Sequence, residues 1–211
     1  MSLKDAEFGD VVFVERRRDV RIIVSIPGRY SLSDRRDARG ERRVFACRAV
    51  NVSPHAIALA TPVNGNVGER VFAHIDHLGK LEGPVVRPLE RGFVMNIVAS
   101  EEERDRLAAK IEWLESYKNH DAQDLRADGR MVPANPYSKM VLSDGSVETC
   151  LVLDLSVSGA AISADTVPEV GTVLAIGRVV GRVVRHFVGG FGVQFVERQN
   201  PHVVEAMVIR G

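Results

Sequence analysis

Residues 79–97 read GKLEGPVVRPLERGFVMNI, and residues 177–195 read GRVVGRVVRHFVGGFGVQF. With a constant offset of 98 between the two stretches, seven of the nineteen positions are identical. The shared positions are two spaced glycines, a Val-Val-Arg run and a Gly-Phe pair. Self-similarity over such a stretch is the signature of a duplicated structural unit. The sequence therefore predicts two copies of one domain.

The repeat extends upstream with a second offset. CRAVNVS (47–53) matches CLVLDLS (150–156) with an offset of 103, and a Val-Gly pair at 67–68 recurs at 170–171. The two offsets differ by five residues. This difference predicts a longer strand or loop around AHIDHLGK (73–80) in the first copy.

Each copy has the pattern of a β-rich domain. In the first copy, short runs dense in Val, Ile, Phe and Ala are separated by Gly, Pro and Asn. Such runs with regular turns between them indicate antiparallel strands rather than alternating strands and helices. The predicted fold is mainly all-β, with two small antiparallel barrels.

A helix is predicted after the first barrel, at about residues 100–118. Ser100 and Glu103 have the spacing of a capping box, and Leu107, Ile111 and Leu114 place one apolar stripe along the helix. Trp113 is expected to anchor this helix on a barrel.

These patterns predict a domain organisation. The first barrel with its helix occupies residues 1–118, a linker spans 119–125, and the second barrel occupies 126–211 with room for one short helix at its end.

Composition limits the class of protein. The 211 residues include 28 basic and 28 acidic side chains, with 45% hydrophobic and 27% charged residues, as in soluble globular proteins. No apolar run reaches the ~20 residues that span a bilayer, and no secretory signal is evident. With two cysteines and no disulfide framework, a cytoplasmic location is expected. The zero net charge conceals a local excess of positive charge, because residues 15–48 contain eleven arginines and only five acidic residues.

Both copies carry the same two polar elements in the same order. In the first copy, Arg17 and Arg21 form an R-x-x-x-R spacing flanked by Arg16 and Arg18, and Asn51 and Ser53 follow in the sequence NVSPHA (51–56). In the second copy, Arg126 and Arg130 precede Asp154, Ser156 and Gly159 in DLSVSG (154–159).

These elements resemble PilZ domains, which are receptors for the bacterial second messenger cyclic di-GMP. The family signature is R-x-x-x-R on an N-terminal arm, followed by [D/N]-x-S-x-x-G on a barrel strand. The resemblance covers nearly the whole chain and implies two tandem six-stranded barrels. It also implies a non-enzymatic receptor that signals through a protein partner by changing its domain orientation, in motility, exopolysaccharide or cell-cycle control.

The chemistry of these residues suits such a ligand. A guanidinium can bind phosphate with two N–H groups, pair with guanine O6 and N7, or stack on a base. An Asp or Asn oxygen can accept from guanine N–H groups, and a serine hydroxyl can reach a phosphate or a base. A terminal glycine permits a positive φ or close backbone approach.

By resemblance, the ligand residues of copy two are Arg126, Arg130, Asp154, Ser156 and Gly159. Those of copy one are Arg17, Arg21, Asn51 and Ser53, with Arg16 and Arg18 as possible additions. Copy one departs from the signature at Ala56, which puts its affinity in doubt. In the family, the residue before R-x-x-x-R is thought to bias stoichiometry, so Arg16 implies a stacked ligand pair and Leu125 a single ligand.

Several other residues invite simpler interpretations. Cys47 and Cys150 occupy equivalent positions and are expected to be small buried hydrophobic residues rather than a disulfide. His74 and His77 lack companions with metal-ligand spacing, so no metal site and no cofactor are expected. His55 lies inside the first motif, either touching the ligand or exposed in a loop.

Two alternatives to a receptor remain. One is a ligand-independent PilZ-like scaffold for protein contacts. The other, less favoured, is a pair of nucleic-acid-binding barrels that use the arginines of 15–48, where few aromatic residues are available for base stacking. An enzyme is disfavoured because the sequence lacks G-x-S-x-G, H-E-x-x-H, Walker and dinucleotide-binding motifs.

Overall fold

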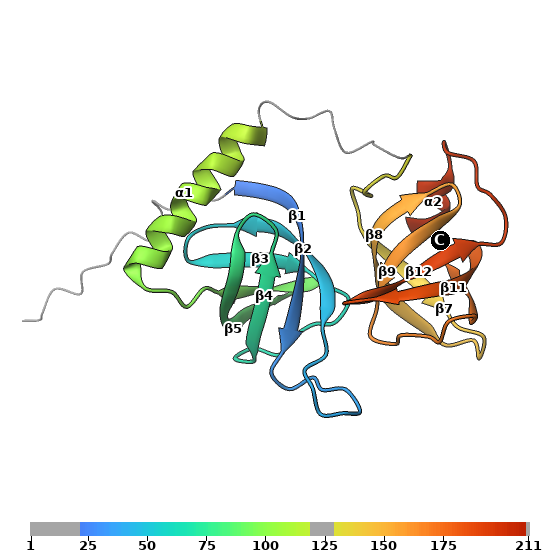
Figure 1. The fold of residues 1–211 in the computed structure, drawn as a ribbon, viewed down its shortest axis with the longest axis horizontal. Helices are drawn as coiled ribbons and strands as arrows, with labels where there is room; N and C mark the ends of the chain where they lie inside the picture. The colour runs from blue at the N-terminus through green and yellow to red at the C-terminus, as the bar shows by residue number, and fades with distance from the viewer. Residues whose placement is uncertain (1–21, 119–128, 210–211) are drawn as a thin grey trace, which may run out of the picture.

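The first copy of the repeat folds into a closed barrel of six antiparallel strands. A computed structural model describes residues 22–118 and 129–209. The strands are joined in the order β1-β2-β3-β6-β5-β4 (Figure 1). Their bounds are β1 Ile22–Leu32, β2 Phe45–Val52, β3 Ala56–Ala60, β4 Arg70–Ile75, β5 Gly79–Leu89 and β6 Gly92–Asn96.

The second copy repeats this topology strand by strand. Its closed barrel is ordered β10-β11-β12-β9-β8-β7, so that β7 corresponds to β1, β8 to β2, and so on. The bounds are β7 Tyr137–Val141, β8 Val147–Ser156, β9 Gly159–Ser163, β10 Val173–Ile176, β11 Val179–Phe187 and β12 Gly190–Phe195. A short helix, α2 (Val204–Ile209), follows. The predicted fold class of two six-stranded barrels is confirmed.

The stretch that revealed the repeat forms the β5–β6 hairpin and its counterpart β11–β12. The Gly-Phe pair shared by the two copies has a steric role, because a Cβ on Gly92 would lie 2.0 Å from Leu59 O. A Cβ on Gly190 would likewise lie 2.2 Å from Ile162 O. Only glycine permits this approach of neighbouring strands, and the phenylalanine after it fills the barrel core.

The five-residue difference in offset lies in the hairpin before this stretch. Strand β4 has six residues and β10 has four, and the turn before β5 is longer than the turn before β11. The predicted insertion around 73–80 is confirmed.

Each barrel encloses its own hydrophobic core. Cys47 lies in the core of the first barrel and Cys150 in that of the second, and both are free and buried, as predicted. Burial raises the pKa of Cys150 to about 12 and raises that of Cys47 still further. Both thiols are therefore protonated at neutral pH.

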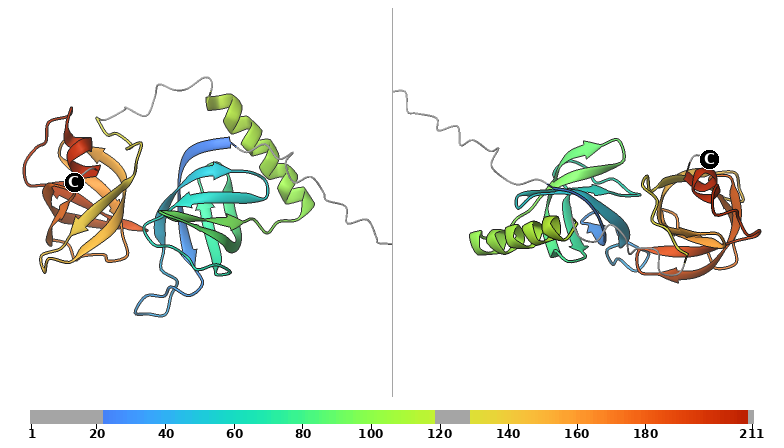
Figure 2. Two further views of the ribbon diagram at one scale, coloured as in Figure 1. Left: turned by 180° about the vertical axis from the view of Figure 1, so that it is seen from behind. Right: turned by 90° about the horizontal axis from the view of Figure 1, so that it is seen from above.

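Helix α1 (Glu101–Lys118) lies on the side of the first barrel that faces away from the second (Figures 1 and 2). The Ser100–Glu103 capping box is present, with reciprocal hydrogen bonds between the two residues. Leu107 and Ile111 are buried against the barrel, as predicted. Trp113 is 50% exposed, and its ring lies 6.2 Å from that of His77 in the turn between β4 and β5, so it contacts the barrel without being buried in it.

The two barrels share a packed interface centred on β2 and β8. Tyr137 joins Ala60 and Leu151 in a buried cluster that includes residues of both barrels. The Tyr137 hydroxyl donates to Arg91 O (2.5 Å) and accepts from Thr61 N (3.0 Å). The described helices include none that is long and apolar enough to cross a membrane.

Candidate functional site

A β-bulge precedes the Asn or Asp of the motif in both barrels. The β2–β3 register shifts between Ala49 and Asn51, and the β8–β9 register shifts at the equivalent place, between Val152 and Asp154. A bulge adds one residue to one strand and re-aims the side chain that follows it. The sequence repeat thus preserves a local backbone irregularity next to the predicted ligand residues.

The motif serine organises the turn that follows the bulge. Ser156 Oγ donates to Gly159 O (3.1 Å) and accepts from Ser158 N (3.3 Å). In the first barrel, Ser53 Oγ makes the corresponding bond to Ala56 O (3.2 Å). The serine therefore has a structural role in both copies: it stabilises the turn that follows the Asn or Asp of the motif.

In the second barrel, the described motif residues converge on one cavity of about 260 Å³. Its lining includes Arg130, Asp154, Ser156 and Gly159, together with Arg185. These residues come from the segment before β7, from β8, from the start of β9 and from β11. Four of the five copy-two residues predicted from sequence thus meet in one place.

Arg130 and Asp154 form the charged pair of this cavity. Arg130 Nη1 lies 3.6 Å from Asp154 Oδ2, and their side chains are 53% and 34% exposed. Main-chain bonds between Met131 and Leu155, of 2.7 and 2.8 Å, hold the arginine segment along β8. The pair is accessible, so both side chains keep N–H groups or oxygen lone pairs for a ligand.

Arg185 belongs to this cavity and was not predicted as a site residue. It pairs with Gly192 across β11 and β12, and a Cβ on Gly192 would lie 3.1 Å from Arg185 Cγ. The absence of a side chain at Gly192 therefore makes room for the arginine stem. The signal was present in the sequence, because Arg185 and Arg87 are identical positions of the repeat.

Gly159 is required for close approach rather than for a positive φ. A Cβ there would lie 2.4 Å from Val193 O, and its φ is not in the left-handed region. In the first barrel, Ala56 occupies the equivalent register position, opposite Asn96, without a positive φ. The alanine therefore leaves the turn intact, although the motif glycine is missing.

The first barrel presents a polar atom with no partner in the described residues. Asn51 Oδ1 is buried and accepts no hydrogen bond there. A buried unsatisfied oxygen is unfavourable by about 1–3 kcal/mol, so it favours a bound donor. Arg16, Arg17, Arg18, Arg21 and Arg126 lie outside the described residues, and so do the predicted linker 119–125 and Leu125.

The first motif also contacts helix α1. His55 Nδ1 forms a short hydrogen bond with Arg104 of α1, and His55 O accepts from Ile97 N at 2.8 Å. His74 is exposed on β4, and His77 occupies the following turn with a φ of 65°. Within residues 22–118 and 129–209, no group of three His, Cys, Asp or Glu side chains could hold a metal.

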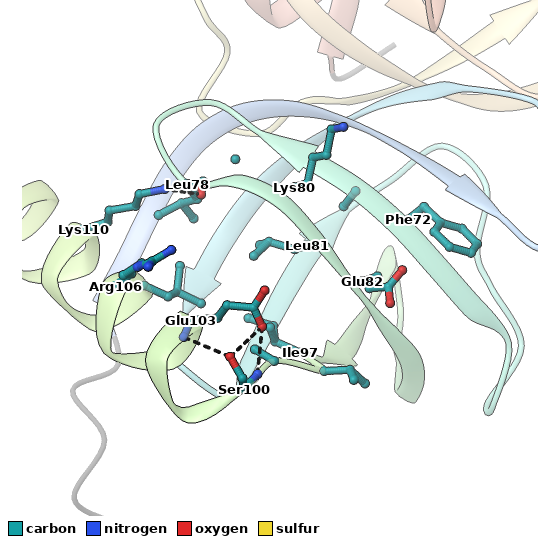
Figure 3. A pocket seen from close by; sticks show the side chains of 15 residues that line it. Phe72, Leu78, Lys80, Leu81, Glu82, Ile97, Ser100, Glu103, Arg106 and Lys110 are labelled. Atoms are coloured by element: carbon teal, nitrogen blue, oxygen red, sulfur yellow. Dashed lines mark hydrogen bonds between the residues drawn. The ribbon is translucent and has the colours of Figure 1, made fainter.

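A larger cavity of about 660 Å³ lies between α1 and the β4–β5 hairpin (Figure 3). Leu81, Ile97 and Leu107 form part of its apolar wall, and Lys110 Nζ donates to Leu78 O at its edge (2.9 Å). None of the predicted ligand residues lines it. It is therefore separate from the site defined by the repeated motifs.

Comparisons with known proteins place the first barrel in a family. Residues 15–113 match the model of the PilZ domain. Among solved structures, PlzA of Borreliella burgdorferi in complex with c-di-GMP is 14% identical, with 89% of this chain and 91% of that chain covered and a TM-score of 0.28. MotI/DgrA, an inhibitor of motility from Bacillus subtilis, is 9% identical, with coverages of 89% and 94% and a TM-score of 0.28. YcgR from Escherichia coli in complex with c-di-GMP is 14% identical, with coverages of 87% and 80% and a TM-score of 0.26. A search of curated protein sequences found no match.

Proposed function

This chain contains a PilZ domain in its first barrel and repeats that topology in its second, and we propose that it is a cytoplasmic receptor for cyclic di-GMP. The observation that carries the proposal is the cavity of the second barrel. An arginine, an aspartate and a serine turn converge there in the arrangement that the family signature describes.

The side chains around this cavity match the functional groups of a cyclic dinucleotide. Arg130 and Arg185 supply planar guanidinium donors for phosphate or for guanine O6 and N7. Asp154 supplies carboxylate oxygens for the N–H groups of guanine. Arg126 would complete the clamp from the arm that precedes Arg130.

The first barrel is proposed as a second binding site. Asn51 Oδ1 offers an acceptor without a partner in the described residues, and Ser53 shapes the same turn as its counterpart. Arg17 and Arg21 would supply the cations, with Arg16 and Arg18 beside them. On the family pattern, Arg16 favours a stacked pair of ligands in this site, whereas Leu125 favours a single ligand in the other.

Ligand binding would change the relative orientation of the two barrels, and a protein partner would recognise this change. The motif strands β2 and β8 both contact the interface between the barrels, so a shift at either site acts on that interface directly. The first motif also contacts α1 through the bond between His55 and Arg104.

Calorimetric titration with cyclic di-GMP tests this function. The wild type is compared with Arg17→Ala/Arg21→Ala and with Arg126→Ala/Arg130→Ala, and each double variant is expected to lose the heat of one site. Absence of heat with the wild type at high micromolar ligand would support the ligand-independent scaffold instead. Salt-sensitive binding to any polyanion without preference for guanine would support nucleic-acid binding.

A further inference from the structure

Arg48 is a buried arginine of the first barrel whose hydrogen-bond partners belong to the second. It lies on β2 and is 5% exposed. Its Nη1 donates to Pro133 O (2.8 Å), and its Nη2 donates to Leu153 O (3.1 Å). Among the described residues, no carboxylate pairs with Arg48. Its buried charge is therefore stabilised by these two carbonyl oxygens of the second barrel.

The two carbonyls that Arg48 holds belong to the two chain segments that carry the predicted ligand residues. Leu153 is the residue that the β-bulge takes out of register, immediately before Asp154. Pro133 follows Arg130 in the segment that pairs with β8 through Met131 and Leu155. One guanidinium therefore bridges the strand that carries Asp154 and the segment that carries Arg130.

The chemistry of the bridge requires arginine. A guanidinium presents several N–H groups in a fixed plane and can reach two acceptors at once, whereas an ammonium is a compact point charge. The second copy has Leu151 at the equivalent position, where it joins the apolar cluster of the interface. The arginine is therefore not part of the shared barrel architecture.

We propose that Arg48 is a positioning residue for the cyclic di-GMP site of the second barrel, acting across the domain interface. By holding Pro133 and Leu153 together, it fixes the spacing between Arg130 and Asp154, which are 3.6 Å apart. The inference rests on the proposed function of that site. Because coupling between two sites is reciprocal, ligand binding in the second barrel also strengthens the hold of Arg48.

The test uses the full chain carrying Arg17→Ala/Arg21→Ala, so that only the second barrel titrates. Adding Arg48→Met is expected to weaken cyclic di-GMP binding by about tenfold, within the usual range for coupled sites. Arg48→Lys, which keeps the charge without the fork, should give a partial loss. The matched control is Arg43→Ala, because Arg43 bridges the same two barrels through Asp165 at 2.6 Å without contacting the site. This control should stay within about twofold of the parent chain.

A second measurement needs no ligand. Trypsin cleavage after Arg130 reports how firmly the arginine segment is held, and Arg48→Met should accelerate it while Arg43→Ala should not. Thermal unfolding confirms that each variant is folded; if Arg48→Met does not fold, Arg48→Gln and Arg48→Lys take its place. Unchanged affinity and cleavage in folded variants would overturn the proposal. Absence of binding by the parent chain would remove the proposed function of the second barrel, while the cleavage comparison would still test the anchoring.

Discussion

Arg130 and Asp154 lie 3.6 Å apart in the cavity of the second barrel, where Arg130 ends the arginine motif and Asp154 begins the aspartate-serine motif. The R-x-x-x-R spacing carries little information alone in an arginine-rich chain, and the aspartate-serine motif is only moderately specific. Their convergence, together with a serine turn and a cavity, turns two short patterns into one candidate site for a cyclic dinucleotide.

The charged pair predicts a separation of binding from stability. Asp154→Ala should abolish most ligand binding in the second barrel, because the acceptor for guanine N–H groups is lost. The unliganded protein should lose less than about 1 kcal/mol, since an exposed ion pair contributes little. Calorimetry and urea unfolding measure the two effects. Asp154→Asn restores the residue type of copy one and should retain much of the binding; equal loss in both variants would contradict an acceptor role.

Gly159 provides a steric prediction. Gly159→Ala would place a Cβ 2.4 Å from Val193 O and force β9 away from β12. A loss of about 1–3 kcal/mol in the free energy of unfolding is expected, as for other overpacked sites. The reciprocal exchange Ala56→Gly should change stability by no more than about 1 kcal/mol, the usual effect of backbone entropy. If urea unfolding gave equal losses of unfolding free energy for Gly159→Ala and Ala56→Gly, the explanation by close strand approach at Gly159 would be refuted.

The buried thiols predict a response to alkaline pH. Burial holds the pKa of Cys150 at about 12, whereas the unfolded thiol titrates near its ordinary value. Below that ordinary value both states are protonated and the thiol adds no pH dependence. Above it, only the unfolded state loses its proton, so stability falls as the pH rises toward 12.

Alkylation and unfolding measurements check this behaviour. Iodoacetamide should leave Cys47 and Cys150 unmodified in the native protein at pH 8 and label both in urea. Cys150→Ala should reduce the alkaline slope of the unfolding free energy. Rapid labelling of either thiol in the folded chain would show that the core is more open than described.

Tyr137 predicts how the two barrels depend on each other. Tyr137→Phe removes the hydroxyl that joins Arg91 O and Thr61 N across the interface, and leaving such groups unpaired is unfavourable by about 1–3 kcal/mol. Calorimetric unfolding should show the transitions of the two barrels moving apart. Tyr30→Phe, a matched change whose hydroxyl bond to Val63 lies within the first barrel, should lower stability without that separation. Identical traces for the two variants would argue against a coupling role.

Most of the fold could be predicted from the sequence because the two copies of the domain are still similar in sequence. The glycines of the repeat are fixed by close strand approach, and the different offsets correspond to one longer hairpin. The helix followed from its capping box and apolar stripe. The exposure of Trp113 did not follow from the sequence, because aromatic character alone does not say how deeply a side chain is buried.

The site was harder to predict where its residues act through backbone geometry. The β-bulge before Asp154 has no sequence signature, and it determines how the motif side chain is presented. Arg185 reaches the cavity because Gly192 has no side chain opposite it, which depends on strand register. Arg48 appeared only as part of an arginine-rich segment, since its partners are main-chain carbonyls of the other copy.

The most direct measurement is a titration of the second site alone, with cyclic di-GMP and cyclic di-AMP compared in the Arg17→Ala/Arg21→Ala chain. We predict saturable binding of cyclic di-GMP with one ligand per chain, and loss of this binding in Asp154→Ala. Cyclic di-AMP should bind about tenfold more weakly or worse, because a site that hydrogen-bonds guanine leaves its polar groups unpaired with adenine. Equal affinity for the two dinucleotides, or no heat with either one in the folded chain, would contradict a cyclic di-GMP site in the second barrel.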